Sequence, residues 1–147
     1  MDTVLEEIAN HLEYFGYTIE KEEPENDTDR LTYHARHERR FNLRYFEMNK
    51  NFVLFQICFS TDIQPTPELS ETINEFNRIG LLAKYYYTTN TEGFVLIYIE
   101  AMYIGVYAKT TFGLFYDMFE TDHRKARESD AYKKCFITKQ EPTYMVQ

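Results

Sequence analysis

The chain has 147 residues, which is the usual size of a single domain and is enough to bury about two-thirds of the surface of its unfolded state. Apolar residues make up 44% of the sequence and aromatic residues 17%, a composition that excludes a disordered chain. The 24 acidic and 16 basic residues give a net charge of −8, so nucleic acid, whose phosphates carry charge of the same sign, is not expected as a partner.

A helix is predicted at the N-terminus, where apolar side chains recur at helical spacing. Thr3 can cap this helix, Glu6 completes a capping box and Gly16 ends it. The next residues, Tyr17 to Asp29, are highly charged and contain Pro24, which predicts a short strand followed by an exposed acidic turn. The apolar stripe of the helix consists of Val4, Leu5, Ile8, Leu12 and Phe15.

From residue 31 the pattern changes to a period of two, which predicts a strand whose buried face carries Phe41, Leu43 and Tyr45. A turn at Met48 to Asn51 leads into a second strand, Phe52 to Phe59, because Asn tolerates the left-handed backbone of a tight turn. This second strand is apolar on both faces except for Gln56, so we expect it at the centre of a sheet.

Two prolines then end the strand and introduce a predicted helix over Pro67 to Ile79, with Thr66 as its cap and Gly80 as its stop. Its buried stripe is predicted to consist of Leu69, Ile73, Phe76 and Ile79.

A second hairpin is predicted from two strands rich in β-branched and aromatic residues, Leu81 to Thr88 and Phe94 to Ile99. Gly105 ends the apolar run, and a third helix follows from Thr110 or Thr111 with Phe112, Phe115 and Phe119 on its apolar face. The tail from Ser129 to Gln147 has a mixed composition, which is compatible with a short strand, a last turn or a loosely ordered segment.

Helices separated by runs of antiparallel strands predict an α+β fold, in which a β-sheet made of a meander and a hairpin is packed against helices. The chain contains no internal repeat and no linker long enough to divide it, so residues 1–147 are expected to form one domain.

Cys58 and Cys135 are too few for a disulfide framework and have no CxxC or CxxH companion, which fits a reducing cytoplasm. The acidic N-terminus lacks the basic and apolar segments of a signal peptide. The most apolar stretch, Phe94 to Ala108, is interrupted by Glu100 and is shorter than the roughly 20 residues of a membrane-spanning helix. We therefore expect a cytoplasmic protein with no membrane span.

The middle and C-terminal half of the chain, about Phe52 to Phe119, resembles the YbjN family, which shares the fold of type III secretion chaperones. The similarity is carried by Asn74 and Asn77 on the helix, the strand Lys84-Tyr85-Tyr86-Tyr87, the turn Glu92-Gly93, the strand Phe94 to Glu100, and Gly105-Val106. This resemblance implies a small, acidic, non-enzymatic cytoplasmic domain that binds proteins and frequently dimerises. It implies no catalytic residue.

A metal or cofactor site is not expected. His34 and His37 would point to opposite faces of a strand and are interpreted as solvent-exposed, while His11 and His123 fall on different helices. Cys58 lies in an apolar strand, where a thiol normally acts as a small core residue. No Gly-rich phosphate-binding motif and no nucleophile motif occurs.

Three classes of function follow. The first is a protein-interaction module, either chaperone-like or regulatory, which offers an apolar surface to a protein partner. The second is a small enzyme whose site is assembled from distant residues, and a deep polar pocket would favour it if two or more of the following lined it: His11, His34, His37, His123 and Cys58. The third is a nucleic-acid-binding regulator that uses Arg36, Arg39, Arg40 and Arg44.

The first class is preferred because 25 aromatic residues exceed what one core needs, and excess aromatic surface is typical of partner sites. We expect the second hairpin or the last helix to contact a partner or a second copy in a homodimer. The alternative is that the charged tail from Ser129 folds back over the same surface. The candidate partner-binding residues are Tyr85, Tyr87 and Tyr98.

Overall fold

The computed structural model describes residues 3–26, 29–137 and 143–145. The strands are β1 (Thr18–Glu22), β2 (Thr32–Arg36), β3 (Leu43–Asn49), β4 (Phe52–Ser60), β5 (Lys84–Thr89), β6 (Val95–Ile104) and β7 (Thr143–Met145). The helices are α1 (Val4–Tyr14), α2 (Pro67–Ile79), α3 (Lys109–Glu128) and the short α4 (Asp130–Tyr132), which continues into a π-helical turn over Lys133–Ile137.

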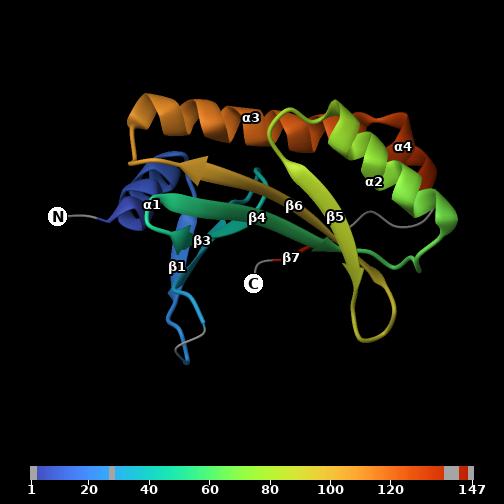
Figure 1. Cartoon of the computed structure of the whole chain (residues 1–147), viewed down its shortest axis with the longest axis horizontal. Coiled ribbons are helices and arrows are strands. Elements are labelled where there is room, and N and C mark those ends of the chain that lie inside the picture. The colour runs from blue at the N-terminus through green and yellow to red at the C-terminus, as the bar shows by residue number, and fades with distance from the viewer. Residues whose placement is uncertain (1–2, 27–28, 138–142, 146–147) are drawn as a thin grey trace.

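The strands form one antiparallel sheet in the order β1-β2-β3-β4-β6-β5, and β7 pairs with the end of β4. The predicted α+β class, a meander and a hairpin with helices packed on the sheet, is therefore confirmed (Figure 1). The central position predicted for β4 is also confirmed, because this strand lies between β3 and β6.

All three long helices pack on the same face of the sheet. The strand register aligns Tyr33, Tyr45, Phe55 and Ala101 in one row, and these residues face α1 and α3. Phe76 of α2 reaches the same face and packs on the ring of Tyr85. In Figure 1, α3 runs along this face with α2 and α4 beside its C-terminal end and α1 near its start. The opposite face carries no helix among the described residues, and we call it the open face.

Several elements match the sequence prediction closely. The helix α2 begins at Pro67 and ends at Ile79 as expected, although the Thr66 side chain makes no capping hydrogen bond. In α1, Thr3 accepts a hydrogen bond from the Glu6 backbone N–H at 3.2 Å, while the Glu6 side chain turns to Lys21 and Tyr33. Asn51 has the left-handed backbone expected of the turn, with φ of 64°.

Other elements differ from the prediction. The period-two region is two strands, β2 and β3, because residues 37–42 form a loop held by His37. The strand β5 begins at Lys84 and not at Leu81, since residues 81–83 wrap around the carboxylate of Asp122. In the predicted tail the structure describes α4, the π-helical turn and β7, and residues 138–142 and 146–147 lie outside the described part. None of the described helices combines the length and hydropathy needed to cross a membrane.

Candidate functional site

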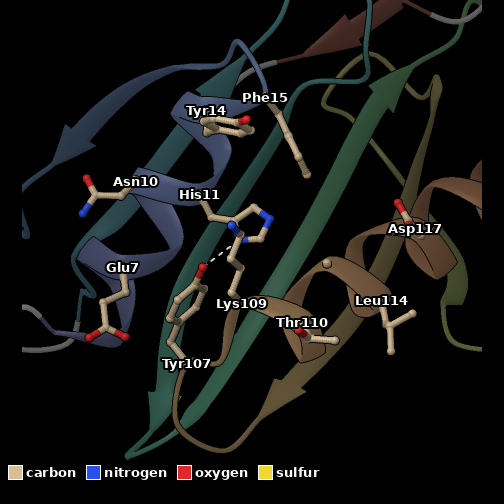
Figure 2. A pocket seen from close by; sticks show the side chains of 11 residues that line it. Glu7, Asn10, His11, Tyr14, Phe15, Tyr107, Lys109, Thr110, Leu114 and Asp117 are labelled. Atoms are coloured by element: carbon tan, nitrogen blue, oxygen red, sulfur yellow. Dashed lines mark hydrogen bonds between the residues drawn. The ribbon is translucent and has the colours of Figure 1, made fainter.

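A groove lies between α1 and the first half of α3 and encloses about 800 Å³. Figure 2 shows the two helices facing each other across it. From α1 and the residue after it come Glu7, Asn10, His11, Tyr14 and Phe15. From α3 and the residues before it come Tyr107, Lys109, Thr110, Gly113, Leu114 and Asp117.

The walls of the groove combine apolar and charged side chains. Tyr14 is 86% exposed and Leu114 is 62% exposed, so both side chains offer apolar surface beside the hollow. Gly113 has no side chain to fill the groove at the α3 wall, and a Cβ added there would meet no atom within 4 Å. Glu7, Lys109 and Asp117 provide charges around these apolar groups. An apolar centre with a polar rim is the composition of protein-binding sites.

His11 forms the base of the groove and holds its two walls together. Its Nδ1 atom lies 2.7 Å from the hydroxyl of Tyr107, as the dashed line in Figure 2 marks. The imidazole packs edge-on against Phe15 and Phe112, with ring centroids 4.8 and 4.9 Å away. Burial and the nearby Lys109 charge lower the pKa of His11, which keeps the ring neutral at pH 7.

The C-terminal end of α1 is fixed by the loop between β2 and β3. The Nε2 atom of His37 donates to the carbonyl of Phe15 at 3.0 Å, and its Nδ1 accepts the backbone N–H groups of Arg39 and Arg40. Gly16 makes this approach possible: its φ is +98°, and a Cβ there would lie only 3.0 Å from the His37 ring.

A second hollow, of about 660 Å³, lies between this loop and the last turns of α3, and we call it the basic cleft. Its four arginines are Arg39, Arg40, Arg124 and Arg127, against which stand Glu38 and Glu120. Arg40 is held in place, because it lies over the rings of Phe15 and Tyr116 and pairs with Glu120 at 3.2 Å. The cleft therefore carries an excess of positive charge in a strongly acidic chain.

His123 closes the inner end of the basic cleft and is almost fully buried against the ring of Phe41. Burial, reinforced by the charge of Arg127, lowers the pKa of His123 to about 4. The ring is therefore neutral in the folded protein at pH values where an unfolded histidine would already be protonated.

This neutral histidine gives a pH-dependent stability. The unfolded chain binds a proton at His123 below pH 6.5 and the folded chain does so only near pH 4, so stability is complete above pH 6.5 and falls as the pH drops through this range. We expect the free energy of unfolding to fall by roughly 2–3 kcal/mol between pH 6.5 and pH 4. In denaturant titrations, the advantage of the wild type over His123→Gln should shrink by this amount from pH 7 to pH 4. A constant difference would contradict the burial of a neutral ring.

The open face of the sheet has a polar row across its centre. Arg44 donates to Gln56 at 2.5 Å, Gln56 donates to Glu100 at 2.5 Å, and the hydroxyl of Tyr86 donates to Glu100 at 2.7 Å. These strands thus satisfy their polar groups among themselves. On either side lie apolar side chains, including Phe52 and Ile104, which are 40% and 63% exposed.

The three predicted partner-binding tyrosines do not lie together. Tyr85 is 2% exposed and packs under α2 against Phe76, so the expectation that it lies on a free surface is wrong. Tyr87 points to the same side and is half-buried against the core. Tyr98 lies on the open face, stacked on Tyr86 with ring centroids 4.9 Å apart. The sheet alternates as predicted, but α2 covers the side that carries Tyr85.

The four predicted arginines do not form one patch. Arg36 and Arg44 belong to the open face, where Arg36 pairs with Glu20, whereas Arg39 and Arg40 turn toward α3. Arg36 and Arg39 nevertheless line one hollow beside Gly16. The exposed position expected for His34 is wrong, because this ring is 5% exposed and its Nε2 atom lies 2.9 Å from Glu22.

Among the described residues, neither the cysteines nor the potential metal ligands form a further candidate site. Cys58 is buried in β4, as expected of a core residue, and its thiol and that of Cys135 are both outside any disulfide. Among the described residues no group of three or more histidine, cysteine, aspartate or glutamate side chains could hold a metal ion.

Sequence reasoning missed the residues that shape the groove and the cleft. Gly113, Asp117, Glu120, Arg124 and Arg127 recur at intervals of four and three residues, which places them on one face of α3. This stripe, on a different face from the phenylalanines, could have been recognised in the sequence. The residues of the facing wall, on α1 and on the β2–β3 loop, could not have been predicted to lie there, because they are distant in sequence.

Comparison with solved structures identifies the architecture. The crystal structure of YbjN from E. coli, described as a putative transcription regulator, superposes with a TM-score of 0.55 over 83% of this chain and 87% of that chain. The fold is YbjN-like. An uncharacterised protein from Methanothermobacter thermautotrophicus has a similar structure, with a TM-score of 0.59 over 84% of this chain and 93% of that one.

The YbjN-like fold, expected from the resemblance of the sequence, is thus confirmed over most of the described residues. Sequence identity is 13% to the E. coli protein and 12% to the archaeal one, so the similarity is one of fold. No model of a known protein family and no curated protein sequence matches this chain.

Proposed function

We propose that this chain is a non-enzymatic protein-interaction domain, which binds a segment of a partner protein in the groove between α1 and α3. The observation that carries this proposal is the groove itself, where exposed Tyr14 and Leu114 flank a hollow of about 800 Å³ and Gly113 has no side chain to fill it. A hollow of this size accepts one or two large apolar side chains of a peptide segment.

Catalysis is the weaker alternative, although the basic cleft brings His37 and His123 together. Both ring nitrogens of His37 are engaged with backbone groups, so this ring holds a loop and has no nitrogen left to accept a proton from a substrate. His123 is neutral and almost fully buried, with a pKa of about 4. His11 in the groove is hydrogen-bonded to Tyr107. The rings of His37 and His123 are therefore unsuited to act as a general base.

The description of the E. coli protein as a putative transcription regulator is compatible with a domain that acts by binding. A regulatory role and a chaperone-like role both require a surface for a protein segment, and the groove supports either. We further propose a reducing, cytoplasmic location, which two cysteines outside any disulfide support. Partner contacts at Tyr87 and Tyr98, and assembly as a homodimer, stay predictions.

The proposal is tested by filling the groove. Gly113→Trp places a large ring where an added Cβ meets no neighbour within 4 Å, and replacing a glycine inside a helix adds helix propensity of about 0.5–1 kcal/mol. The variant should therefore fold. Peptide segments selected from a random display library on the full wild-type chain should lose at least about tenfold in affinity for Gly113→Trp.

Asn74→Trp is the matched control, because it adds the same ring at an exposed position of α2 far from the groove. Selected segments should bind this control as tightly as the wild type in fluorescence anisotropy. Failure to select any segment, or equal binding to the wild type and Gly113→Trp, would contradict the proposed function.

A further inference from the structure

We infer that the partner segment carries acidic side chains, which bind in the basic cleft while an apolar side chain of the same segment fills the groove. The inference rests on the proposed function and adds the chemistry of the partner. It follows from the succession of the two hollows along one face of α3 and from the charge of the cleft.

The groove and the basic cleft lie one after the other along one face of α3, and we call the two together the trough. Gly113 and Asp117 line the groove, and Glu120, Arg124 and Arg127 line the cleft. Their spacing of four, three, four and three residues keeps all five on one face of the helix. Gly113 and Arg124 are 11 positions apart, or about 16 Å along the axis. A segment of about five extended residues spans this distance.

The opposite walls of the groove and of the basic cleft meet at Phe15. Phe15 lines the groove, and the guanidinium of Arg40, which lines the cleft, lies over the same phenylalanine ring at 5.5 Å. His37 ties the carbonyl of Phe15 to the loop that carries Arg39 and Arg40. A ligand that leaves the groove past Phe15 therefore meets the arginines directly.

The charges of the cleft select an acidic ligand. Four arginines face two glutamates there, and one of these glutamates, Glu120, is already paired with Arg40. Among the residues that the structure describes, the exposed guanidinium groups of Arg39 and Arg124 have no ion-pair partner. They come from two different elements and face one hollow. Guanidinium groups bind carboxylates through paired N–H donors, so this arrangement fits an aspartate or glutamate cluster.

A protein segment fits the cleft better than nucleic acid does. Single strands bind proteins by stacking their bases on exposed aromatic rings. In the cleft wall, the ring of Phe41 is buried, at 8% exposed, and it stacks on the buried ring of Tyr116, over which Arg40 lies. The net charge of −8 also repels a phosphate backbone at long range, whereas a short acidic segment carries few charges.

The test uses the full chain and the display-selected segments as probes. These segments should contain an apolar residue and, within about five residues, a group of Asp or Glu. Arg39→Gln with Arg124→Gln should weaken their binding at least about tenfold, and added salt should weaken binding to the wild type. The matched control is Lys125→Gln with Lys133→Gln, which removes the same charge from exposed positions outside the cleft and should change affinity less than about twofold.

Two outcomes would overturn the inference. Segments that need Gly113 but carry no acidic group, or that bind Arg39→Gln/Arg124→Gln as tightly as the wild type, would refute the role of the cleft and leave the groove as the binding site. Mixed-sequence single-stranded or duplex DNA that binds as tightly as the acidic segments, and loses binding in the same double variant, would assign the cleft to nucleic acid instead. Gly113→Trp tests separately whether a segment binds in the groove at all, so failure of the proposed function is distinguished from failure of this inference.

Discussion

Phe76→Ala is expected to lower the free energy of unfolding by about 3–5 kcal/mol, because it removes a large buried ring and leaves a cavity that the sheet cannot close. The ring is 2% exposed and lies 5.4 Å, centroid to centroid, from Tyr85 on the covered face of the sheet. This contact, together with two hydrogen bonds between Asn77 and the Tyr85 backbone, holds α2 on the β5 edge. Denaturant titration measures the change directly.

Glu71→Ala is the control for this prediction. Glu71 lies on the exposed side of the same helix, so the substitution should change stability by less than about 0.5 kcal/mol. Similar small effects of the two substitutions would mean that α2 presents a different face to the sheet.

Asp122→Ala is expected to be nearly as costly, at about 3–4 kcal/mol. The Asp122 carboxylate is 1% exposed and accepts the backbone N–H groups of Leu81, Leu82 and Ala83 at distances of 2.7–3.1 Å. Alanine would leave these three donors without acceptors inside the protein. The bonds also set the point where the chain turns from α2 into β5, so their loss should loosen the whole edge.

Asp117→Ala is the matched control, because it removes a carboxylate from an exposed position of the same helix and should cost less than about 0.5 kcal/mol. Asp122→Asn should have an intermediate effect, since the amide keeps one acceptor oxygen of the two. Hydrogen exchange at residues 81–83 is a second measurement. Unchanged protection of these amides in Asp122→Ala would contradict the role assigned to the carboxylate.

Local sequence signals were sufficient to predict single helices and turns. The bounds of α2 follow from Pro67, Gly80 and a regular apolar stripe, and the left-handed turn follows from Asn51. These features depend on neighbouring residues, and the physical preferences of a few side chains decide them. The antiparallel sheet with helices packed on it follows from the order of the elements.

Tertiary contacts decided the rest. Period-two alternation separates Tyr85 from Tyr86, but only the position of α2 determines which of the two is buried. The break between β2 and β3 depends on the hydrogen bonds of His37 to a distant carbonyl. The buried role of Asp122 depends on amides about 40 residues away. Such long-range partners leave no periodic trace in the sequence.

The candidate site was predictable only in part. Leu114 and Met118 of α3 are 62% and 41% exposed, and the expectation that the last helix contacts a partner stays a prediction. The groove needs α1 as its second wall, and the cleft needs the β2–β3 loop. The sequence pattern alone suggested the second hairpin, where the polar row of the open face is already hydrogen-bonded within the sheet.

The most direct measurement is an NMR titration of the isotopically labelled full chain with a display-selected segment. Binding in the trough along α3 predicts that the largest amide shifts occur at residues 10–16 and 113–117, and that residues 39, 40 and 124 follow if the segment is acidic. Shifts confined to β5 and β6 around Tyr86 and Tyr98, with α1 and α3 unchanged, would place the partner on the open face of the sheet and contradict the groove as the binding site.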